Sequence, residues 1–371
     1  MKTRLPGGGW RRLACGVALA ALALARPCAG QDEPRPPAEG ETVRLPPLKA
    51  RLWVGKESRD VTLVGRTDLS VLVAGGVEGA PAAKIRIAQI ARAQFDLGYD
   101  PGEVAKAERR SDWGGAIRLL QPGLKGPMAY LDLPDNNAAE AALDMGTCML
   151  RAAHRTATKP EEQAQARRQY EAAAEVFTAC ARAEWSRVAQ LGVLKGCRCL
   201  LGINKVKTAQ YHVNRMSEPA PGDAAYGHYW LVRAELAHRA GQFREALDAV
   251  VKSVCFENKD IETFPDALLL SARCYEETLD PYRARDVYFE VASIFPRTDW
   301  ADDAADRLQA ILDAGKTRGK EVSPIENVFF GMNEDINKLA AELLRKRREA
   351  AKTDDEAEKE APPPKEKPPE E

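Results

Sequence analysis

The residues that could do chemistry in this chain form no recognised catalytic pattern. The sequence has no glycine-rich loop before a lysine, no Gly-x-Ser-x-Gly turn and no His-Glu-x-x-His helix. Gly75-Gly76-Val77-Glu78-Gly79 fits a hairpin connection better than a nucleotide loop. The carboxylate pairs Asp302-Asp303 and Glu276-Glu277 are expected on exposed helix faces, where charge is solvated. We therefore expect a protein that is not an enzyme and that uses no cofactor.

Metal and disulfide chemistry would need the cysteines and histidines. Beyond Gly30 the cysteines are Cys148, Cys180, Cys197, Cys199, Cys255 and Cys274. Cys197-Arg198-Cys199 has neither a zinc nor a haem spacing, and the chain has only 4 histidines, so no metal site is expected. Cys255 and Cys274 are predicted on neighbouring helices, and for this pair both a disulfide and buried free thiols remain open.

The N-terminal residues resemble a secretory signal in composition. Residues 1–12 carry four basic residues and no acid, and residues 13–25 form an apolar run too short to span a bilayer. The small residues Cys28, Ala29 and Gly30 predict cleavage after residue 30, although a retained anchor and twin-arginine export are alternatives. We expect an exported protein of the periplasm, the cell envelope or the exterior, with no stable membrane insertion after signal removal.

The charge balance argues against a polyanionic partner. Without residues 1–30 the chain has 49 basic and 55 acidic side chains, a net charge of −6. This balance predicts binding of neither nucleic acid nor anionic lipid. The basic run Arg345-Lys346-Arg347-Arg348 is interpreted as a solvated helix end.

An apolar-Ala-apolar pattern occurs five times along the chain. The copies are Trp113-Ala116-Leu120, Tyr170-Ala173-Phe177, Val206-Ala209-Val213, Phe243-Ala246-Val250 and Pro281-Ala284-Tyr288. Positions i, i+3 and i+7 share one helix face, and the last four alanines are 36, 37 and 38 residues apart. A small residue, Cys197, Ala234 or Ala272, precedes each of the last three alanines by twelve residues. The spacing predicts stacked pairs of antiparallel helices, joined by short turns such as Ala240-Gly241-Gln242.

This two-helix register resembles the tetratricopeptide repeat family. The unit ending at Pro296 has the family's residues at Leu268, Ala272, Tyr275, Ala284 and Tyr288. The unit with Trp230, Ala234, Gly241, Phe243 and Ala246 matches nearly as well. The unit around Ala209 is weaker, and those around Ala116 and Ala173 have lost most markers of the first helix. The resemblance covers residues 105–315 and implies an α-solenoid. An ordinary alanine-rich helical bundle is the alternative.

The resemblance also implies a binding surface. In tetratricopeptide arrays the first helix of each pair lines the concave face, and the residue after the small contact position points into it. In this chain the residues so placed are Arg198, Glu235 and Arg273, with His238, Arg239, Glu276 and Glu277 one turn further along. Charges that alternate in this way suit an extended protein or peptide partner. The alternative is a set of weak, solvated surface pairs.

Before the repeats, residues 48–99 show the alternation of Val, Leu and Ile that is typical of strands. Strands are predicted over 49–54, 60–65, 69–74 and 84–89, with a last strand or short helical turn ending at Phe95. The segment resembles the five-stranded, Sm-like small barrels that precede repeat arrays in some secreted bacterial proteins. About 55 residues fold alone only marginally, so we expect the segment to pack on the first helices. A proline-rich linker over 31–47 is expected before it.

The C-terminal part is predicted to contain one helix and a tail. Residues 325–352 carry an apolar stripe of Ile336, Leu339, Leu343 and Leu344, and we expect this helix to cap the array. Residues 353–371 contain eight acids, three lysines and five prolines, a composition that predicts disorder.

The predicted fold is thus mainly α, a tetratricopeptide-like α-solenoid of antiparallel helix pairs preceded by a small β-barrel-like domain. We expect a non-enzymatic exported adaptor or scaffold that binds a protein or peptide on the concave face. One alternative is a structural subunit of a cell-envelope complex without a peptide groove. The other is an auxiliary factor for a cell-wall or polysaccharide enzyme.

Overall fold

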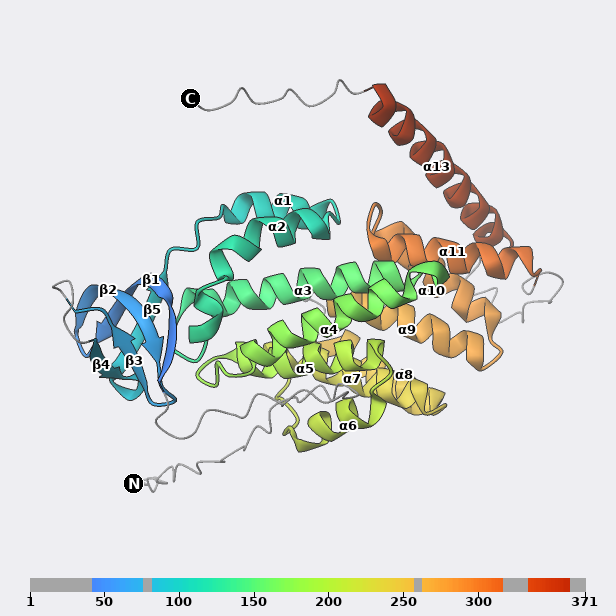
Figure 1. The fold of residues 1–371 in the computed structure, drawn as a ribbon. Coiled ribbons are helices and arrows are strands. Elements are labelled where there is room, and N and C mark those ends of the chain that lie inside the picture. Colours follow the sequence, from blue (N-terminus) through green and yellow to red (C-terminus); the bar gives the residue numbers. More distant parts are fainter. Residues whose placement is uncertain (1–41, 76–81, 257–261, 316–332, 361–371) are drawn as a thin grey trace, which may run out of the picture. The chain divides into compact units, whose positions relative to one another are not determined.

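The strands of this protein come first along the chain and the helices follow (Figure 1). The computed structural model describes residues 42–75, 82–256, 262–315 and 333–360. The predicted signal peptide, most of the predicted linker, the Gly76 side of one hairpin and residues 361–371 lie outside these ranges. No helix in the described ranges is both long enough and apolar enough to cross a membrane.

Five antiparallel strands form a curled, half-barrel sheet in the order β4-β3-β2-β1-β5. The strands are β1 (Val43–Val54), β2 (Glu57–Arg66), β3 (Ser70–Val73), β4 (Ala83–Arg86) and β5 (Ile90–Phe95), with a short 3₁₀ turn, η1 (Ile87–Gln89), before the last. The apolar side chains of alternate positions form its core, and Leu52, Leu63 and Val71 have no exposed surface. A strand lies at each of the four predicted positions, although the fourth ends at Arg86 and not at residue 89. The last element, left open as a strand or a helical turn, is a strand.

The first strand begins earlier than the sequence predicted. Residues 43–47, assigned above to the linker, belong to β1, which pairs with β2 from Val43 onward. Pro46 and Pro47 have no amide hydrogen, and the strand register shifts between Arg44 and Leu48, so the prolines occupy an irregularity that a proline tolerates. Gly65 lies opposite, where an added Cβ would be 2.5 Å from the Val43 carbonyl oxygen.

The sheet contacts the start of α3 and the segment that leads into it. Arg66 at the end of β2 forms two hydrogen bonds of 2.6 Å with the carboxylate of Asp132 and one with the Ala129 carbonyl. Asn137 at the start of α3 pairs with the backbone of Phe95, donating at 2.8 Å and accepting at 2.9 Å. The free edge of β5 is therefore covered by the chain that leads into α3.

The helical part begins at Pro101. Its helices are α1 (Pro101–Arg109), α2 (Trp113–Leu124), α3 (Asn137–Ala157), α4 (Gln163–Cys180), α5 (Arg187–Gly202), α6 (Val206–Arg215), α7 (Ala224–Arg239), α8 (Phe243–Phe256), α9 (Thr263–Glu277), α10 (Pro281–Ile294), α11 (Asp299–Asp313) and α13 (Asn333–Glu360). Short 3₁₀ turns, η2 (Pro127–Tyr130) and η3 (Pro160–Glu162), lie beside α3. Side chains of Asp, Asn, Ser and Thr accept hydrogen bonds from the first backbone amides of many of these helices, which fixes where each begins.

The predicted alanine contacts are confirmed. Consecutive helices pack against each other, and Ala116, Ala173, Ala209, Ala246 and Ala284 all have 0% exposed surface. The predicted small partners Ala234 and Ala272 are also fully buried, and the Cys197 thiol lies 3.7 Å from the Ala209 carbonyl oxygen. A small residue on each helix lets the two backbones approach closely at the crossing.

Four of the helix pairs are joined by the same turn. The turns after α1, α5, α7 and α9 each place one residue at positive φ, namely Ser111, Asn204, Gly241 and Leu279. The following amide bonds back to the carbonyl of the first helix's last turn, at 2.8 Å from Lys205 to Leu200 and at 2.9 Å from Gln242 to Ala237. This is the C-terminal cap in which a left-handed residue reverses the chain. Glycine fills the position only once, at Gly241.

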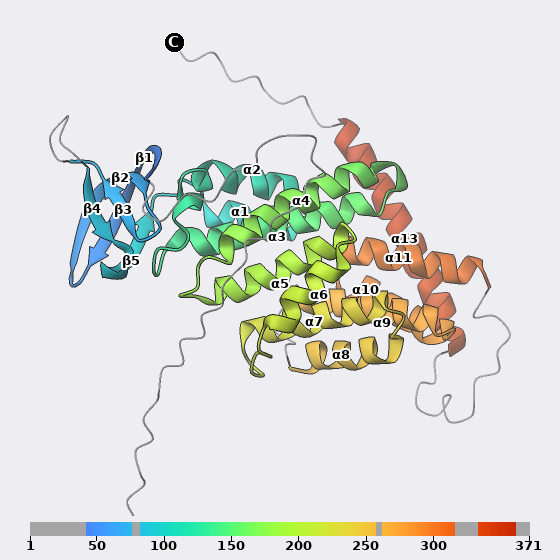
Figure 2. The same ribbon diagram turned by 60° about the horizontal axis from the view of Figure 1, so that its bottom comes forward.

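Helices also contact each other across pairs. α3 packs on α5, α5 on α7, α7 on α9, and α9 on α11. These are the first helices of successive pairs. In Figure 2, α3, α5 and α7 lie one below another down the picture.

The C-terminal helix differs from its prediction in register and in length. α13 packs on α10 and α11 through Ala340 and Leu344, with Leu343 at the edge, whereas Leu339 is 38% exposed. The helix also continues to Glu360, so residues 353–360 are not a disordered tail. These residues are mainly Ala, Glu and Lys, which have high helix propensity, and the prolines begin only at Pro362. Residues 325–332 lie outside the described ranges.

Candidate functional site

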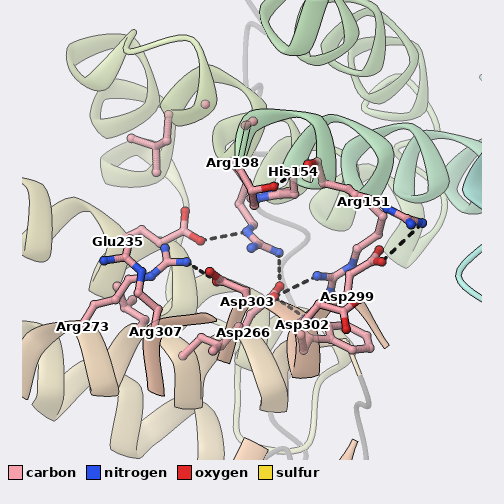
Figure 3. A pocket seen from close by; sticks show the side chains of 18 of the residues that line it. Arg151, His154, Arg198, Glu235, Asp266, Arg273, Asp299, Asp302, Asp303 and Arg307 are labelled. Carbon is pink, nitrogen blue, oxygen red and sulfur yellow. Dashed lines mark hydrogen bonds and ion pairs between the residues drawn. The ribbon is translucent and has the colours of Figure 1, made fainter. Parts of the chain in front are cut away.

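The first helices surround a cavity of about 790 Å³ (Figure 3). Its wall combines the C-terminal ends of α3, α5 and α7 with the middle of α9 and the first half of α11, and Tyr170 of α4 completes it. Seven basic and six acidic side chains face it: Arg151, Arg155, Lys159, Arg198, Arg239, Arg273, Arg307, Glu235, Asp266, Asp299, Asp302, Asp303 and Asp306.

Five of the seven residues proposed from the sequence line this cavity. They are Arg198, Glu235, His238, Arg239 and Arg273. Glu276 and Glu277 lie one helical turn beyond it, where Glu276 accepts a hydrogen bond from the Tyr288 hydroxyl and Glu277 is exposed. The five residues on α5, on α7 and in the middle of α9 therefore lie in the cavity wall, and the two at the end of α9 lie outside it.

Arg198 is the centre of the charge network. Its guanidinium lies 3.0 Å from a Glu235 carboxylate oxygen on α7 and 2.7 Å from an Asp266 oxygen on α9. Only 5% of the Arg198 side chain is exposed, so this is a buried network and not a solvated surface pair. One arginine thus joins the inner faces of α5, α7 and α9.

Asp266 receives a second arginine and a tryptophan. Arg151 of α3 donates to it at 2.8 Å and also donates at 3.0 Å to the backbone carbonyl of Glu262. Trp300 of α11 donates from its indole nitrogen to the same carboxylate at 2.6 Å, and its ring lies under the Arg151 guanidinium at 4.3 Å. Asp266 therefore connects α3, α5, α9 and α11 through a carboxylate that is 10% exposed.

Burial and the neighbouring arginines set the protonation states of Asp266 and His154. Burial alone opposes ionisation of Asp266, but Arg151 and Arg198 hold its pKa well below the usual range. Burial lowers the pKa of His154 to about 3, and the positive charge of Arg198 adds to this shift. Neither group changes its charge near neutral pH, so the network suits electrostatic recognition better than proton transfer.

The wall formed by α11 is acidic. Asp299, Asp302, Asp303 and Asp306 are spaced i, i+3, i+4 and i+7, which places them on one helix face. Asp303 forms an ion pair with Arg273 at 2.6 Å, and the Asp303 side chain is 20% exposed. The expectation that the Asp302-Asp303 pair is simply solvated is therefore wrong for Asp303, while Asp302 is 64% exposed and pairs with Arg347 of α13.

Asp299 links α11 to helices near the start of the helical part. Trp113 at the start of α2 donates its indole hydrogen to Asp299, and Arg155 of α3 lies 3.6 Å from the same carboxylate. Burial raises the pKa of Asp299, and these two partners oppose the shift. The contact joins residues 186 positions apart along the chain.

A second buried polar group continues the network along α3 and α5. Lys195 is 6% exposed, donates to Thr147 at 2.8 Å and pairs with Glu262 at 2.5 Å. Because Glu262 also offers its backbone carbonyl to Arg151, the Lys195 group and the Asp266 group are contiguous. Local sequence gave no signal for Lys195, since no periodic pattern distinguishes it from a solvated lysine.

The six cysteines in the described ranges are free thiols, so Cys255 and Cys274 are not joined in this structure. Cys274 is buried and Cys255 is exposed. Burial raises the pKa of Cys180 and Cys197 to about 12, which leaves their thiols protonated at neutral pH. In the described ranges, no three His, Cys, Asp or Glu side chains converge as metal ligands would.

The comparisons with known proteins identify no relative. No family model, no curated protein and no solved structure matches this chain. The functional proposal therefore rests on the geometry above.

Proposed function

We propose that this protein is a non-enzymatic adaptor that binds a segment of a protein partner in the charged cavity. The observation that carries the proposal is the composition of the cavity wall, which is built by first helices of successive pairs. Arg198, Glu235 and Arg273 occupy equivalent positions on three of them. A wall that presents one charged residue per helix pair can contact successive residues of an extended partner peptide.

A tetratricopeptide-like solenoid is part of the same proposal. Three features support it: the buried alanine at each crossing, the shared turn after α1, α5, α7 and α9, and the contacts between successive first helices. An ordinary bundle would require none of these to recur at equivalent positions. The half-barrel sheet is then an Sm-like module at the start of the array, and α13 is its cap.

Export is proposed from the sequence alone. The basic, apolar and small-residue order over residues 1–30 supports a signal peptide and a place in the periplasm, the cell envelope or the exterior. A protein partner in that compartment fits a net charge that favours neither nucleic acid nor anionic lipid.

The ion pairs inside the cavity support one rival. Arg151 and Arg198 both pair with Asp266, so the network could act only as a brace inside a structural subunit of an envelope complex. In that case the cavity would bind no peptide.

Photo-crosslinking separates the two functions. A benzophenone amino acid would replace Lys159, an exposed residue of the cavity wall, or Arg244, an exposed residue of α8 outside it. Each full-length variant would be incubated with a display library of short random peptides and irradiated. Crosslinking at position 159 and not at 244 supports the adaptor. If crosslinking is absent, or equal at both positions, the adaptor is wrong and the result favours the structural subunit.

A further inference from the structure

Three charged side chains of the cavity wall have no ion-pair or hydrogen-bond partner within the described ranges. They are Arg239 at the end of α7 and Asp306 and Arg307 on α11, and all three are exposed. The deeper charges, in contrast, are committed to one another, as Arg198 is to Glu235 and Asp266. The mouth of the cavity therefore offers charge that the protein itself does not neutralise.

Where α7 meets α9, the unpaired positive charge of Arg239 lies beside polar side-chain atoms that lack a partner. His238 and Arg239 are adjacent on α7, and Arg273 faces them from α9. Nε2 of His238 and Nε of Arg273 are buried without a hydrogen-bond partner. Burial lowers the pKa of His238, and the positive charges of Arg273 and Arg239 lower it further. An anionic group beside Arg239 would find a cation that the protein leaves unpaired, and it could accept a hydrogen bond from Nε of Arg273, which is costly to bury without a partner.

α11 carries unpaired charge of both signs, on Asp306 and on its neighbour Arg307. Asp306 follows Asp302 and Asp303 on the same helix face, and its pKa is raised by burial and by these two carboxylates, against the opposing charge of Arg347. Asp303 is held by Arg273 and Asp302 by Arg347, so Asp306 is the carboxylate of the three that remains unpaired. A cation beside Asp306 would relieve the repulsion.

We propose that the cavity binds a peptide segment carrying one acidic and one basic side chain close in sequence. The acidic side chain would lie against His238, Arg239 and Arg273, and the basic one against Asp306. This inference rests on the proposed function and names the chemistry of the partner. A cavity of about 790 Å³ is large enough for a few residues and not for a folded domain.

Both charges are needed because the two corners have opposite sign. An acidic segment would satisfy the α7–α9 corner and leave Asp306 crowded by its neighbours. A basic segment would do the reverse. Complementarity of this kind acts mainly as specificity, since the wrong charge in either corner is repelled.

The test uses four short peptides of Ala and Ser with the full-length protein. Three are blocked at both ends: one carries Glu and Lys two residues apart, a second only the Glu, and a third only the Lys. The fourth has free termini and no charged side chain. Fluorescence anisotropy gives each affinity. We expect the mixed peptide to bind about tenfold or more tighter than any other. Equal binding of a singly charged peptide would overturn the inference, and tightest binding of the fourth would assign the site to chain ends.

Charge exchange then locates each contact. Arg239→Glu should weaken the mixed peptide about tenfold, and replacing that peptide's Glu by Lys should restore the loss. Asp306→Lys should behave likewise towards a peptide whose Lys is replaced by Glu. Arg244→Glu on α8 is the matched control and should change nothing. Losses without restoration by the exchanged peptide would contradict the assigned contacts, even when melting temperatures are unchanged.

The two proposals fail differently. If library peptides crosslink at position 159 but show no preference for paired charges, the adaptor stands and the mixed-charge segment is wrong. If nothing crosslinks there, both are wrong.

Discussion

Removing the guanidinium of Arg198 should destabilise the protein by about 3 kcal/mol. Arg198→Met keeps the length and most of the apolar stem of a side chain that is 5% exposed. Loss of one partner of a buried ion pair costs about 3–5 kcal/mol, because the other charge is left without compensation. Asp266 would keep Arg151 and Trp300, and Glu235 is 19% exposed and can gain some water, so the lower figure applies.

Urea unfolding at pH 7 measures this cost, with Arg273→Met as the control. Arg273, like Arg198, is an arginine of the cavity wall that forms an ion pair, in this case with Asp303, but the Arg273 side chain is 42% exposed. Its loss should therefore cost no more than about 1 kcal/mol. The reasoning is refuted if the two variants lose the same stability.

The pH dependence gives a second, independent readout. Because the folded pKa of Asp266 is depressed, its ionisation contributes stability that is fully present above the unfolded pKa of about 3.9 and is lost as the pH falls below it. Arg198→Met should raise that folded pKa. The difference in unfolding free energy between wild type and variant should consequently shrink between about pH 4 and pH 2. If the difference in unfolding free energy stays constant over this range, Arg198 does not lower the pKa of Asp266.

Three further outcomes are expected. Ala246→Leu should overpack the α7–α8 crossing and cost about 1–3 kcal/mol, while Ala310→Leu on an exposed face of α11 should leave the melting temperature unchanged. The imidazole signals of His154 should not titrate between about pH 5 and 8, and because this group folds neutral, its contribution to stability should fall as the pH drops below about 6.5. Native protein should react with maleimide at Cys255 and not at Cys197, and modification of Cys197 at a comparable rate would contradict its burial.

The helix crossings could be predicted because their signal is local. An alanine between two apolar residues at i−3 and i+4 marks a contact face whatever the helix packs against, and Ala246 and Ala284 were located in this way. Strand alternation located the sheet for the same reason. The ends of these elements were less predictable, since β1 includes two prolines and α13 includes a run of acids.

The centre of the cavity could not be found from local pattern. Arg151 and Asp266 are 115 residues apart, and their pairing depends on α3 and α9 lying across the same space. Arg198 and Glu235 were found because they share a register position, whereas Asp266 lies two turns before Arg273 on α9 and outside that register. The acidic face of α11 did carry a signal, the i, i+3, i+4, i+7 spacing of its aspartates, but only Asp302 and Asp303 were considered, and they were expected to be solvated.

The contacts of Asp266 and Asp299 have a consequence for how the molecule comes apart. A linear array in which each unit touches only its neighbours can fray from either end, one unit at a time. Here Arg151 holds α3 to α9, and Trp113 holds α2 to α11, so the terminal units are tied back across the interior. Opening one end then requires breaking ties to the other. Amide hydrogens of α3 and α11 should therefore exchange with a common free energy, as they would in a globular domain.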